Sequence, residues 1–542
     1  MAESNIAVKP KRRLHRRLVE RFVITGKLRL TTPAHFGNGE TDNFTDMPLM
    51  KDELDQNKPL LPGSSIAGAL RSYLRERQLG YWQPPPPPPK DNSKKEEDRY
   101  KAEMKKEREL AASLLFGGAR GDDDGGQSPL IVHDALGVAT AYELRDGVRI
   151  EPETRTAEDN KKYDTTLLAA SSTFDLRFDL LIGLPEGCAS RNDQKFKDHR
   201  MALLSTLATA LDGLAKGEIT LGARKRRGFG RCRVDEWTVR SHDLLDRKGL
   251  LAWLAEDRPG WVEAVKPKQD AQIKSALGAN NLIDDNRRRF TMKATFALDG
   301  SLLVRSGTPD EGPDMVHLQS PRPDNNGRMV RRPILAGTSW AGVLRSRATQ
   351  IVNTLAPQRQ KQADDIIECI FGPEEIRTSD RNVKASRIEI AETDIHEFDE
   401  TGKRIIKPLE QTRIKIDRFT GGAFESALFS EEPLFGSRDS RLTMELSLRL
   451  PKDQATQMQH AEIGLLLLLL KDLWTGDLPL GGEVSVGRGR LRGVQAEINY
   501  AGRKWGLEAG GDGLTITAGE RAELEAFVAA LKISLGKEPE IA

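Results

Sequence analysis

An internal repeat is the feature of this sequence that most limits its possible fold. Residues 59–72 (PLLPGSSIAGALRS) recur 274 positions later as residues 333–346 (PILAGTSWAGVLRS). Further along each half, an apolar segment ends in a Phe-Gly pair, at Phe116 and at Phe371, and a strand-like stretch follows. A glycine-rich segment then closes each half. Four anchors in the same order indicate two diverged copies of one domain.

The repeat divides the chain of 542 residues into two large units with several additions. The expected parts are a basic extension at 1–19, a first copy at 20–240 with a proline-rich and charged insertion at 80–110, a helical linker at 241–289, a second copy at 290–500 and a C-terminal extension at 501–542. The C-terminal extension is expected to form a strand and an amphipathic helix that pack on the second copy.

Each copy shows the same order of periodic segments. Apolar residues alternate at 22–30 and 290–298, which predicts half-buried strands. A helix is expected to begin at each Gly-Ser-Ser or Gly-Thr-Ser turn, with a hydroxyl as its N-cap. Strands, a second helix and a last strand follow. This order is that of a ferredoxin-like split βαβ unit, so the predicted fold class is α+β, with two tandem ferredoxin-like (RRM-like) domains.

The composition limits the location and the partner classes. The three cysteines have no C-x-x-C spacing, so neither a zinc site nor a disulfide framework is indicated. Residues 1–21 are basic but lack the apolar core of a signal peptide. The longest apolar run, 463–470, is far shorter than the roughly 20 residues of a membrane span. A cytoplasmic protein is therefore expected, and its net charge of +2 indicates no partner by itself.

The repeated helix starts are the first candidate site. Backbone N–H groups in the first turn of a helix lack partners and the helix dipole is positive there, so a phosphate is favoured. The alternative is an ordinary capped helix. The candidate nucleic-acid-binding residues here are Gly63, Ser64, Ser65 and Arg71 in the first copy and Gly337, Thr338, Ser339 and Arg345 in the second.

The late glycine-rich segments are the second candidate site. They match no G-x-x-x-x-G-K-[ST] phosphate loop. Glycines among clustered cations suit a phosphate backbone, and the alternative is a solvated basic hairpin. The candidate residues are Arg224, Lys225, Arg226, Arg227, Gly228, Gly230 and Arg231 in the first copy and Gly487, Arg488, Gly489 and Arg490 in the second.

These two motifs together resemble the RAMP (repeat-associated mysterious protein) superfamily. More narrowly, the chain resembles the backbone subunits of type III CRISPR effector complexes, fused in tandem in a type III-D-like arrangement. The resemblance covers both copies. It implies ferredoxin-like domains with inserted thumb hairpins, stacked along a guide RNA. It also implies CRISPR guide RNA, target RNA and other subunits of the complex as partners, in a prokaryotic cytoplasm.

The resemblance further implies catalytic residues. In the target-cleaving members, a loop aspartate that precedes the repeated helix start is needed for metal-dependent cleavage of bound RNA. Asp46 and Asp314, each followed by methionine, lie at that place. A divalent metal ion, Mg²⁺ or Mn²⁺, is therefore expected, although neither copy shows a convincing set of metal ligands. One carboxylate, a cation and a nearby Lys or Arg could suffice, because RNA cleavage can use the 2′-hydroxyl of the RNA itself.

Two further expectations depend on the resemblance. His35 lies in a histidine-glycine loop common in the family, and is either an RNA contact or a structural loop histidine. Residues 413–423, which include Arg418, resemble the base of the family's thumb, and residues 149–157, which include Arg155, are a weaker relative. Both arginines are candidate RNA contacts. No single side chain can be chosen as the wedge of the thumb.

The leading hypothesis is a guide-RNA-binding backbone subunit that acts as a metal-dependent endoribonuclease and cuts target RNA at two positions, one per copy. The first alternative is a non-catalytic scaffold that only binds the guide, since a scaffold would share every glycine motif. A guide-processing RAMP endonuclease is the second alternative. The tandem copies, the loop aspartates and the lack of paired histidines argue against it.

Overall fold

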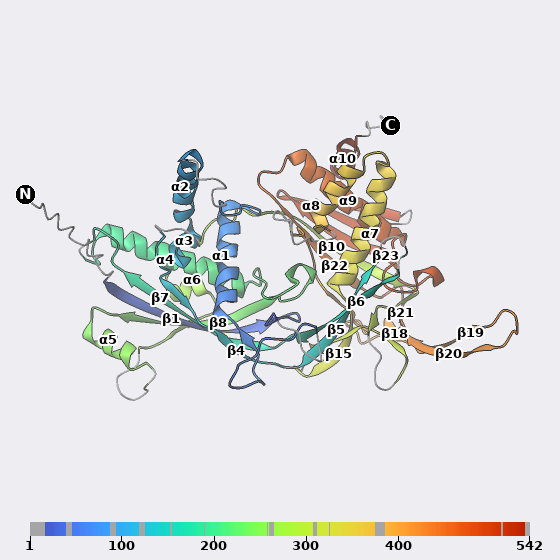
Figure 1. Cartoon of the computed structure of the whole chain (residues 1–542), viewed down its shortest axis with the longest axis horizontal. Helices are drawn as coiled ribbons and strands as arrows, with labels where there is room; N and C mark the ends of the chain where they lie inside the picture. The colour runs from blue at the N-terminus through green and yellow to red at the C-terminus, as the bar shows by residue number, and fades with distance from the viewer. Residues whose placement is uncertain are drawn as a thin grey trace, which may run out of the picture.

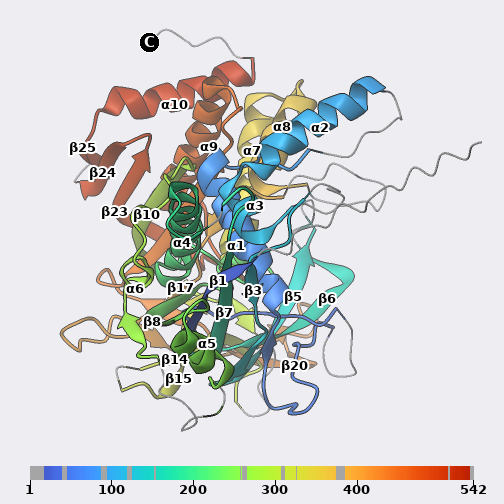
Figure 2. The same cartoon turned by 90° about the vertical axis from the view of Figure 1, so that its left-hand side faces the viewer.

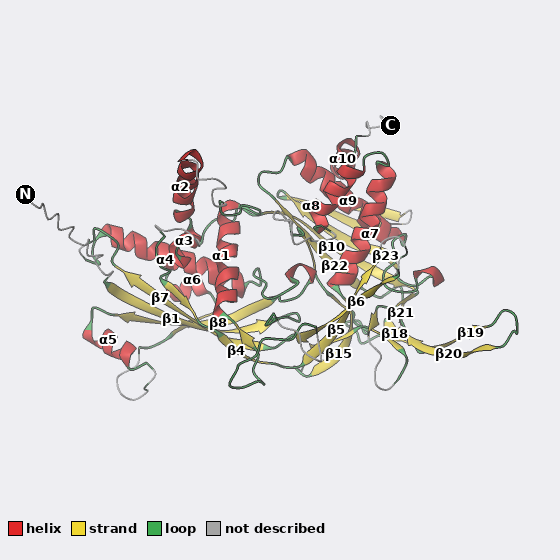
Figure 3. Cartoon of the chain, viewed as in Figure 1, coloured by secondary structure: helices red, strands yellow, loops and turns green. Residues whose placement is uncertain are grey.

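The computed structural model of the chain describes residues 17–39, 46–86, 94–118, 125–151, 154, 156–188, 190–256, 258, 265–306, 312–324, 326–373, 385–510 and 513–536. Arg155, one of the candidate RNA contacts, lies outside these residues. Two sheets, each covered on one face by most of the helices of its unit, form two units side by side (Figures 1 and 3). No described helix is both long enough and apolar enough to cross a membrane.

The first copy has the ferredoxin-like order that the sequence predicts. Its core elements are β1 (Leu18–Leu30), α1 (Gly63–Leu79), β3 (Leu130–Val132), β7 (Thr173–Gly183), α4 (Gln194–Ala215) and β8 (Cys232–Asp243). In the sheet, β7 lies between β3 and β1, and β8 pairs with the other side of β1. All of these pairs are antiparallel. The apolar residues of β1 alternate towards α1 and α4, as residues of one strand face must.

The second copy repeats this arrangement. Its core elements are β10 (Arg288–Asp299), α7 (Gly337–Leu355), β16 (Ile388–Ile390), β22 (Leu442–Leu450), α9 (Thr456–Thr475) and β23 (Arg490–Tyr500). The strand order β16-β22-β10-β23 is that of the first copy. Every second residue of β22 is buried, so this strand alternates strictly between core and surface. The prediction of two tandem ferredoxin-like domains is therefore confirmed.

Smaller elements surround both cores. In the first copy they are β2 (Leu60–Leu61), α2 (Lys94–Arg108), α3 (Ala111–Phe116) and β4 (Ala135–Val138). In the second they are β11 (Ser301–Leu302), β12 (Arg305–Ser306), β13 (Met315–His317), β14 (Gln319–Pro323), β15 (Met329–Leu335), α8 (Gln360–Phe371), β17 (Thr393–Asp394), β18 (Ile406–Pro408) and β21 (Leu434–Gly436). Figure 2 shows α2 projecting away from the first sheet.

The helix starts differ from the prediction in one respect. The N-cap of α1 is Pro62, and no side chain caps the helix. The Pro62 carbonyl itself accepts the N–H groups of Ser65 (3.0 Å) and Ile66 (3.2 Å). The Gly63 N–H donates to Asp134 Oδ1 at 2.6 Å. Ser64 and Ser65 lie inside the first turn of α1, after the N-cap residue, so their hydroxyls are not N-caps. Both serines are exposed.

A long hairpin is inserted in each copy between two core strands, β3 and β7 in the first copy and β16 and β22 in the second. The first hairpin is β5 (Tyr142–Ile150) with β6 (Ala157–Leu168), and the second is β19 (Gln411–Ile416) with β20 (Ala423–Glu432). Residues 417–422 form the turn at the far end of the second hairpin, where Asp417 accepts the N–H of Phe419 at 3.0 Å. The assignment of this segment to the thumb base is therefore wrong. It is the tip, because its glycines and the Asp417 side chain favour a tight turn.

The linker and the C-terminal extension both join the copies that precede them. The expected helical linker holds α5 (Arg247–Leu254) and α6 (Ile273–Leu277), and between them β9 (Lys268–Asp270) extends the first sheet. At the end of the chain, β24 (Arg503–Gly510) and β25 (Gly513–Ala518) extend the second sheet. The expected amphipathic helix is α10 (Arg521–Ser534), which packs on α9. Its backbone approaches Gly464 so closely that a Cβ there would lie 2.2 Å from the Phe527 carbonyl oxygen.

Candidate nucleic-acid groove and carboxylate sites

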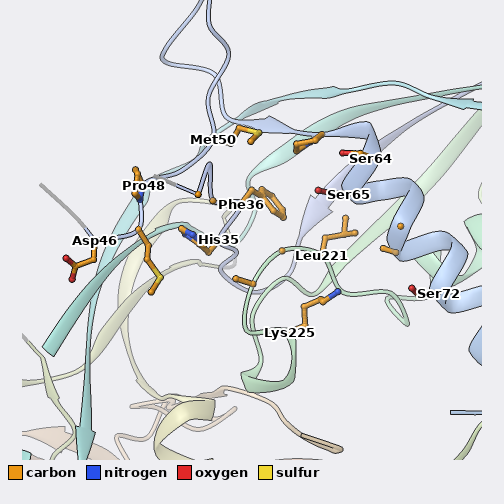
Figure 4. Close-up of a pocket in the computed structure, with 18 residues that line it drawn as sticks. His35, Phe36, Asp46, Pro48, Met50, Ser64, Ser65, Ser72, Leu221 and Lys225 are labelled. Carbon is orange, nitrogen blue, oxygen red and sulfur yellow. The ribbon is translucent and has the colours of Figure 1, made fainter. Parts of the chain in front are cut away.

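A groove of about 910 Å³ runs over the first copy between three segments that carry the sequence motifs. One wall is the N-terminal half of α1, the second is the loop that follows β1, and the third is the glycine-rich loop of residues 221–231 (Figure 4). Its lining includes His35, Gly37, Asp46, Ser64, Ser65, Gly68, Ser72, Gly222 and Lys225. The fold thus brings together the helix start, the loop aspartate and the glycine-rich loop.

The α1 wall of the groove carries only small residues. Ser64, Ser65, Gly68 and Ser72 are exposed on it, and a Cβ built at Gly68 would meet no atom within 4 Å. A ligand backbone can therefore approach the helix closely, and the hydroxyls can hydrogen-bond to phosphate or ribose oxygens. Arg71 lies on another side of the helix, where its Nη2 donates to the Gly117 carbonyl at 3.4 Å.

Asp46 ties the loop of the first copy to the first hairpin. Its Oδ2 accepts the backbone N–H of Asp164 in β6 at 3.0 Å. The next residue, Met47, forms a parallel bridge with Thr165. Asp46 is exposed, so its carboxylate lies at the mouth of the groove with one oxygen engaged by the protein.

Asp314 occupies the equivalent place in the second copy. Its Oδ2 accepts the backbone N–H of Ser430 in β20 at 2.8 Å, and its own N–H donates to the Ser430 hydroxyl at 3.2 Å. Met315 pairs in parallel with Glu431, as Met47 pairs with Thr165. The sequence alignment of Asp46 with Asp314 therefore agrees with the hydrogen bonding and the strand register.

His35 connects the first hairpin to the glycine-rich loop. Its Nδ1 lies 2.8 Å from the Thr166 carbonyl oxygen, and its own carbonyl accepts the Ala223 N–H at 3.0 Å. Only 6% of the residue is exposed. In the second copy, Leu303 takes this place, and its carbonyl accepts the Gly482 N–H at 2.8 Å. The backbone link is thus common to both copies, whereas the imidazole is particular to the first.

His317, the histidine nearest to Asp314 in the sequence, belongs to the interior. Its Nδ1 accepts the Val304 N–H at 3.2 Å, and its Nε2 lies 2.9 Å from the Ile334 carbonyl oxygen. Burial lowers the pKa of His317 to about 4. The side chain is therefore neutral and has no free nitrogen for chemistry.

The four consecutive cations of the first glycine-rich loop, at 224–227, point in different directions. Lys225 is exposed and lines the groove. The Arg224 guanidinium lies over the Tyr163 ring of the first hairpin, 4.5 Å from its centroid, and the Arg226 guanidinium lies over Trp82 at 5.0 Å. The Arg227 backbone contacts the second copy. Burial is the larger cause, and a neighbouring cation the next, of a lowered pKa at Arg226 (to about 10) and at Arg227. The pKa of Lys225 is also lowered, first by partial desolvation of its exposed side chain and then by the charges of Arg449 and Arg226.

Glycines are required where this loop crosses itself. A Cβ at Gly230 would lie 1.8 Å from the Leu221 carbonyl oxygen, and φ at Gly230 is +71°. Gly489 repeats this contact with Leu480 at 1.9 Å, and its φ is +80°. Any side chain at either position would therefore open the loop. Gly228 and Gly487 also have positive φ values, of +89° and +87°.

The second glycine-rich loop keeps the shape of the first but not its charge. Residues 483–486 are Glu-Val-Ser-Val where the first copy has Arg-Lys-Arg-Arg. Arg488 is only 3% exposed and pairs with Glu431 (2.9 Å) and Glu483 (3.1 Å), so its guanidinium has no free surface for RNA. Arg490 is exposed.

The remaining predicted residues lie in separate places. Arg231 is paired with Glu445 of the second copy at 3.5 Å. At the start of α7, Thr338 is exposed and Ser339 is half-buried, and Arg345 lies near enough to Arg227 to lower its pKa, although burial of Arg227 is the larger cause. Arg418 is exposed at the tip of the second hairpin. The groove thus unites only part of the predicted set.

Two residues at the sites were not predicted. Asp164 holds Asp46, and its pKa is raised, first by burial, then by a hydrogen bond and the charge of Asp146, and also by Asp46. Ser430 holds Asp314. Both interactions join residues more than 110 positions apart. Since Asp164 and Ser430 have different side chains and act through the backbone N–H, no sequence motif could reveal them.

The carboxylates alone do not make a metal site. Among the described residues, no group of three His, Cys, Asp or Glu side chains is placed to hold a metal ion. Asp46 and Asp314 could each supply one or two oxygens. A divalent cation at either place would therefore need further ligands from a bound RNA, which is a common arrangement for Mg²⁺.

Comparison with known protein families identifies the family of this chain. The family model of the RAMP superfamily matches residues 27–233 and 322–492, well over half of the chain and one region in each copy. The chain belongs to the RAMP superfamily. No curated protein matches it. The two matched regions agree with a tandem RAMP protein, and membership implies a CRISPR-associated role in RNA binding. The groove, the exposed helix start and Lys225 lie within the first matched region.

Proposed function

We propose that this RAMP protein is a backbone subunit of a type III CRISPR effector complex, in a type III-D-like tandem form, which binds CRISPR guide RNA and cuts the paired target RNA at two positions. The observation that supports this most strongly is the matched anchoring of Asp46 and Asp314 on the two hairpins. A loop aspartate that only faces solvent would not be expected to bond to equivalent, distant strand residues in two diverged copies.

The groove of the first copy suits an RNA backbone. Along α1 it presents serine hydroxyls and Gly68, which has open space around it. The glycine-rich loop contributes the backbone at Gly222 and one exposed cation, Lys225. Few of these groups can read a base, whereas all of them can contact phosphate or ribose. We assign the guide RNA to this groove, which brings the paired target strand to its mouth at Asp46.

The chemistry we propose uses the 2′-hydroxyl of the target. The 2′ oxygen attacks the adjacent phosphorus, the bond from phosphorus to the 5′ oxygen breaks, and the 2′ proton is lost while the departing 5′ oxygen gains one. The exposed oxygen of Asp46 or Asp314 would orient or accept the 2′ proton, and the bond to the hairpin N–H would fix the carboxylate. A Mg²⁺ or Mn²⁺ ion bound jointly by the carboxylate and RNA oxygens would supply charge neutralisation.

A non-catalytic scaffold is the second candidate, and one observation favours it. The carboxylates already accept hydrogen bonds from the protein, and the described residues hold no three-ligand metal group. In that case both aspartates would serve only to hold the loops on the hairpins.

The test is cleavage by the assembled complex. The complex is incubated with end-labelled matching RNA, with magnesium and with EDTA, and the product ends are analysed. Two cuts that need a divalent cation, each leaving a 2′,3′-cyclic phosphate and a 5′-hydroxyl, are expected. Intact target bound under both conditions would establish the scaffold instead.

A further inference from the structure

The linker helix α5 lies on the face of the first sheet that α1 and α4 leave open (Figure 1). Strand residues that do not point towards α1 and α4 point towards this face, because successive side chains alternate. Buried polar atoms nearly always have hydrogen-bond partners. Within the described residues, four atoms on this face have none: Arg21 Nε, Arg177 Nε, Asp179 Oδ1 and Glu256 Oε1. They belong to one connected cluster, since Arg177 lies 3.6 Å from both carboxylates.

Two arginines of this cluster, Arg177 in β7 and Arg240 in β8, form what we call the arginine cradle. The Glu256 carboxylate, in the turn that follows α5, lies between them. Its Oε2 is 3.6 Å from Arg177 Nη2 and its Oε1 is 3.7 Å from Arg240 Nη1, whereas charged hydrogen bonds of this kind are about 2.7–2.9 Å long. Neither guanidinium donates a hydrogen bond to any described residue, and 36% and 37% of the two side chains are exposed. Glu256 thus occupies the arginine cradle without satisfying it.

Three further groups with N–H donors lie beside the arginine cradle. Arg21 Nη2 donates to Asp179 Oδ2 at 2.9 Å, and His133 Nε2 lies 2.8 Å from the same oxygen. The His133 side chain is 40% exposed, and its Nδ1 has no partner in the described part of the chain. Burial lowers the pKa of His242, and the charges of Glu256 and Arg21 reach its ring. A nitrogen of His133 is therefore available to a ligand next to the arginine cradle.

The charges and donors of this cluster favour a phosphate group over a carboxylate. Three guanidinium groups, of Arg21, Arg177 and Arg240, face the carboxylates of Asp179 and Glu256, so moving Glu256 away would leave three cations against one anion. A phosphate monoester carries about −1.5 to −2 charges and three acceptor oxygens, and a guanidinium can bind it through two parallel N–H groups. A carboxylate has one charge and two oxygens. The Glu256 carboxylate reaches neither arginine within hydrogen-bonding distance.

We propose that the arginine cradle is a phosphate-binding site, and that the Glu256 carboxylate holds it closed until a phosphate displaces it. The phosphate is either free or the terminal phosphate of an RNA, since both present the same oxygens. Arg240, α5 and Glu256 lie outside the regions that match the RAMP family model, so the site combines the shared sheet with an addition to it. The proposal does not depend on RNA cleavage at Asp46 or Asp314.

The test is isothermal titration calorimetry of the RNA-free full-length protein with inorganic phosphate at constant ionic strength. The parent chain should bind phosphate, and the double variant Arg177→Gln with Arg240→Gln should weaken binding by at least roughly tenfold, because charged hydrogen bonds are lost. Glu256→Gln should instead bind phosphate more tightly than the parent chain, because a competing negative charge is removed. A variant that merely misfolds would not show this gain.

A short RNA with a 5′-phosphate, compared with the same RNA with a 5′-hydroxyl, distinguishes the two sources of phosphate. If the phosphorylated RNA binds more tightly than both the 5′-hydroxyl RNA and inorganic phosphate, and the double variant removes that difference, the ligand is an RNA end. If inorganic phosphate binds and the two RNAs bind equally, the ligand is free phosphate.

Arg233→Gln is the matched control, since Arg233 is an exposed arginine seven residues earlier in β8 that pairs with Asp235. It should bind phosphate like the parent chain. A phosphate affinity of Glu256→Gln no higher than that of the parent chain would overturn the proposal, and so would an unchanged affinity in the double variant. A hexaglutamate peptide that binds the parent chain more tightly than phosphate would also overturn it, because the site would then serve an acidic protein segment.

Discussion

Asp46 and Asp314 bond to equivalent residues in the second strands of their hairpins, β6 and β20. The Asp46 carboxylate accepts the N–H of Asp164 at 3.0 Å, and the Asp314 carboxylate accepts the N–H of Ser430 at 2.8 Å. The residue after each aspartate then pairs in parallel with the residue after each partner. The two sites can therefore be tested by matched substitutions within one molecule.

The groove assignment predicts different effects for neighbouring cations. Lys225→Ala should weaken guide binding and reduce the slope of log K against log salt by about 0.7, the value for one phosphate contact to a single strand. Arg226→Ala should leave that slope unchanged, because its guanidinium is stacked on Trp82 near the second copy. Filter binding of guide RNA over a salt series measures both. Equal slope changes in the two variants would contradict the assignment.

The buried ion pair of Arg145 with Glu392, between the two copies, predicts a strong and partly correctable loss of stability. Arg145→Ala should destabilise the chain by about 3–5 kcal/mol, because Glu143 is left buried without its cation and Glu392 keeps only Arg322. The double variant Arg145→Met with Glu143→Gln should recover part of that loss, because Glu392 keeps Arg322 and no acid of the cluster is then left without a cation. Urea unfolding monitored by tryptophan fluorescence gives the comparison. A loss in Arg145→Ala no larger than that of an exposed arginine such as Arg418→Ala would show that the contact contributes little.

The interior position of His317 predicts a pH dependence of stability. Its folded pKa of about 4 lies below the usual value of 6.5, so the unfolded chain binds a proton that the folded chain does not. Stability from this group is therefore complete above pH 6.5 and falls as the pH drops towards 4, by up to about 3 kcal/mol. Thermal unfolding of the parent and of His317→Gln should show the steeper acid decline only in the parent. Parallel pH profiles would contradict this reading.

The tip of the second hairpin predicts a binding effect without a stability effect. Phe419 is fully exposed, and its backbone N–H donates to Asp417. Phe419→Ala should leave the melting temperature unchanged and weaken binding of paired RNA by roughly 1–3 kcal/mol, the range for loss of one base–aromatic stack. Thr420→Val tests the turn instead, since its hydroxyl donates to Asp417 at 2.9 Å. If only Thr420→Val weakens binding, turn geometry rather than stacking is responsible.

The sequence predicted the tandem ferredoxin-like cores because the repeated turn and the alternating strands are local patterns. The equivalence of Asp46 and Asp314 was also predicted from sequence, because a methionine follows each of them. Residues 413–423 were assigned to the base of the thumb because a turn motif in the sequence gives no information on its distance from the sheet. Its position depends on the strands that flank it.

Other features of the sites could not be predicted. Arg224 to Arg227 form one basic run in the sequence, but the fold turns only Lys225 fully to the groove and places Arg226 and Arg227 against the second copy. The burial of Arg488 depends on Glu431, which is 57 residues away. Local spacing carries no information on such contacts, because they arise only when distant strands pack together.

Cleavage mapping of the aspartate variants tests the central claim most directly. Complexes with Asp46→Ala, with Asp314→Ala or with both are given matching labelled target RNA, and cut positions and target affinity are measured. We expect each single variant to lose a different cut and the double variant to bind target normally but leave it intact. An exposed loop carboxylate should change stability by no more than roughly 0.5 kcal/mol, so lost cutting reports lost chemistry. Cuts that persist at both positions in the double variant would contradict the account.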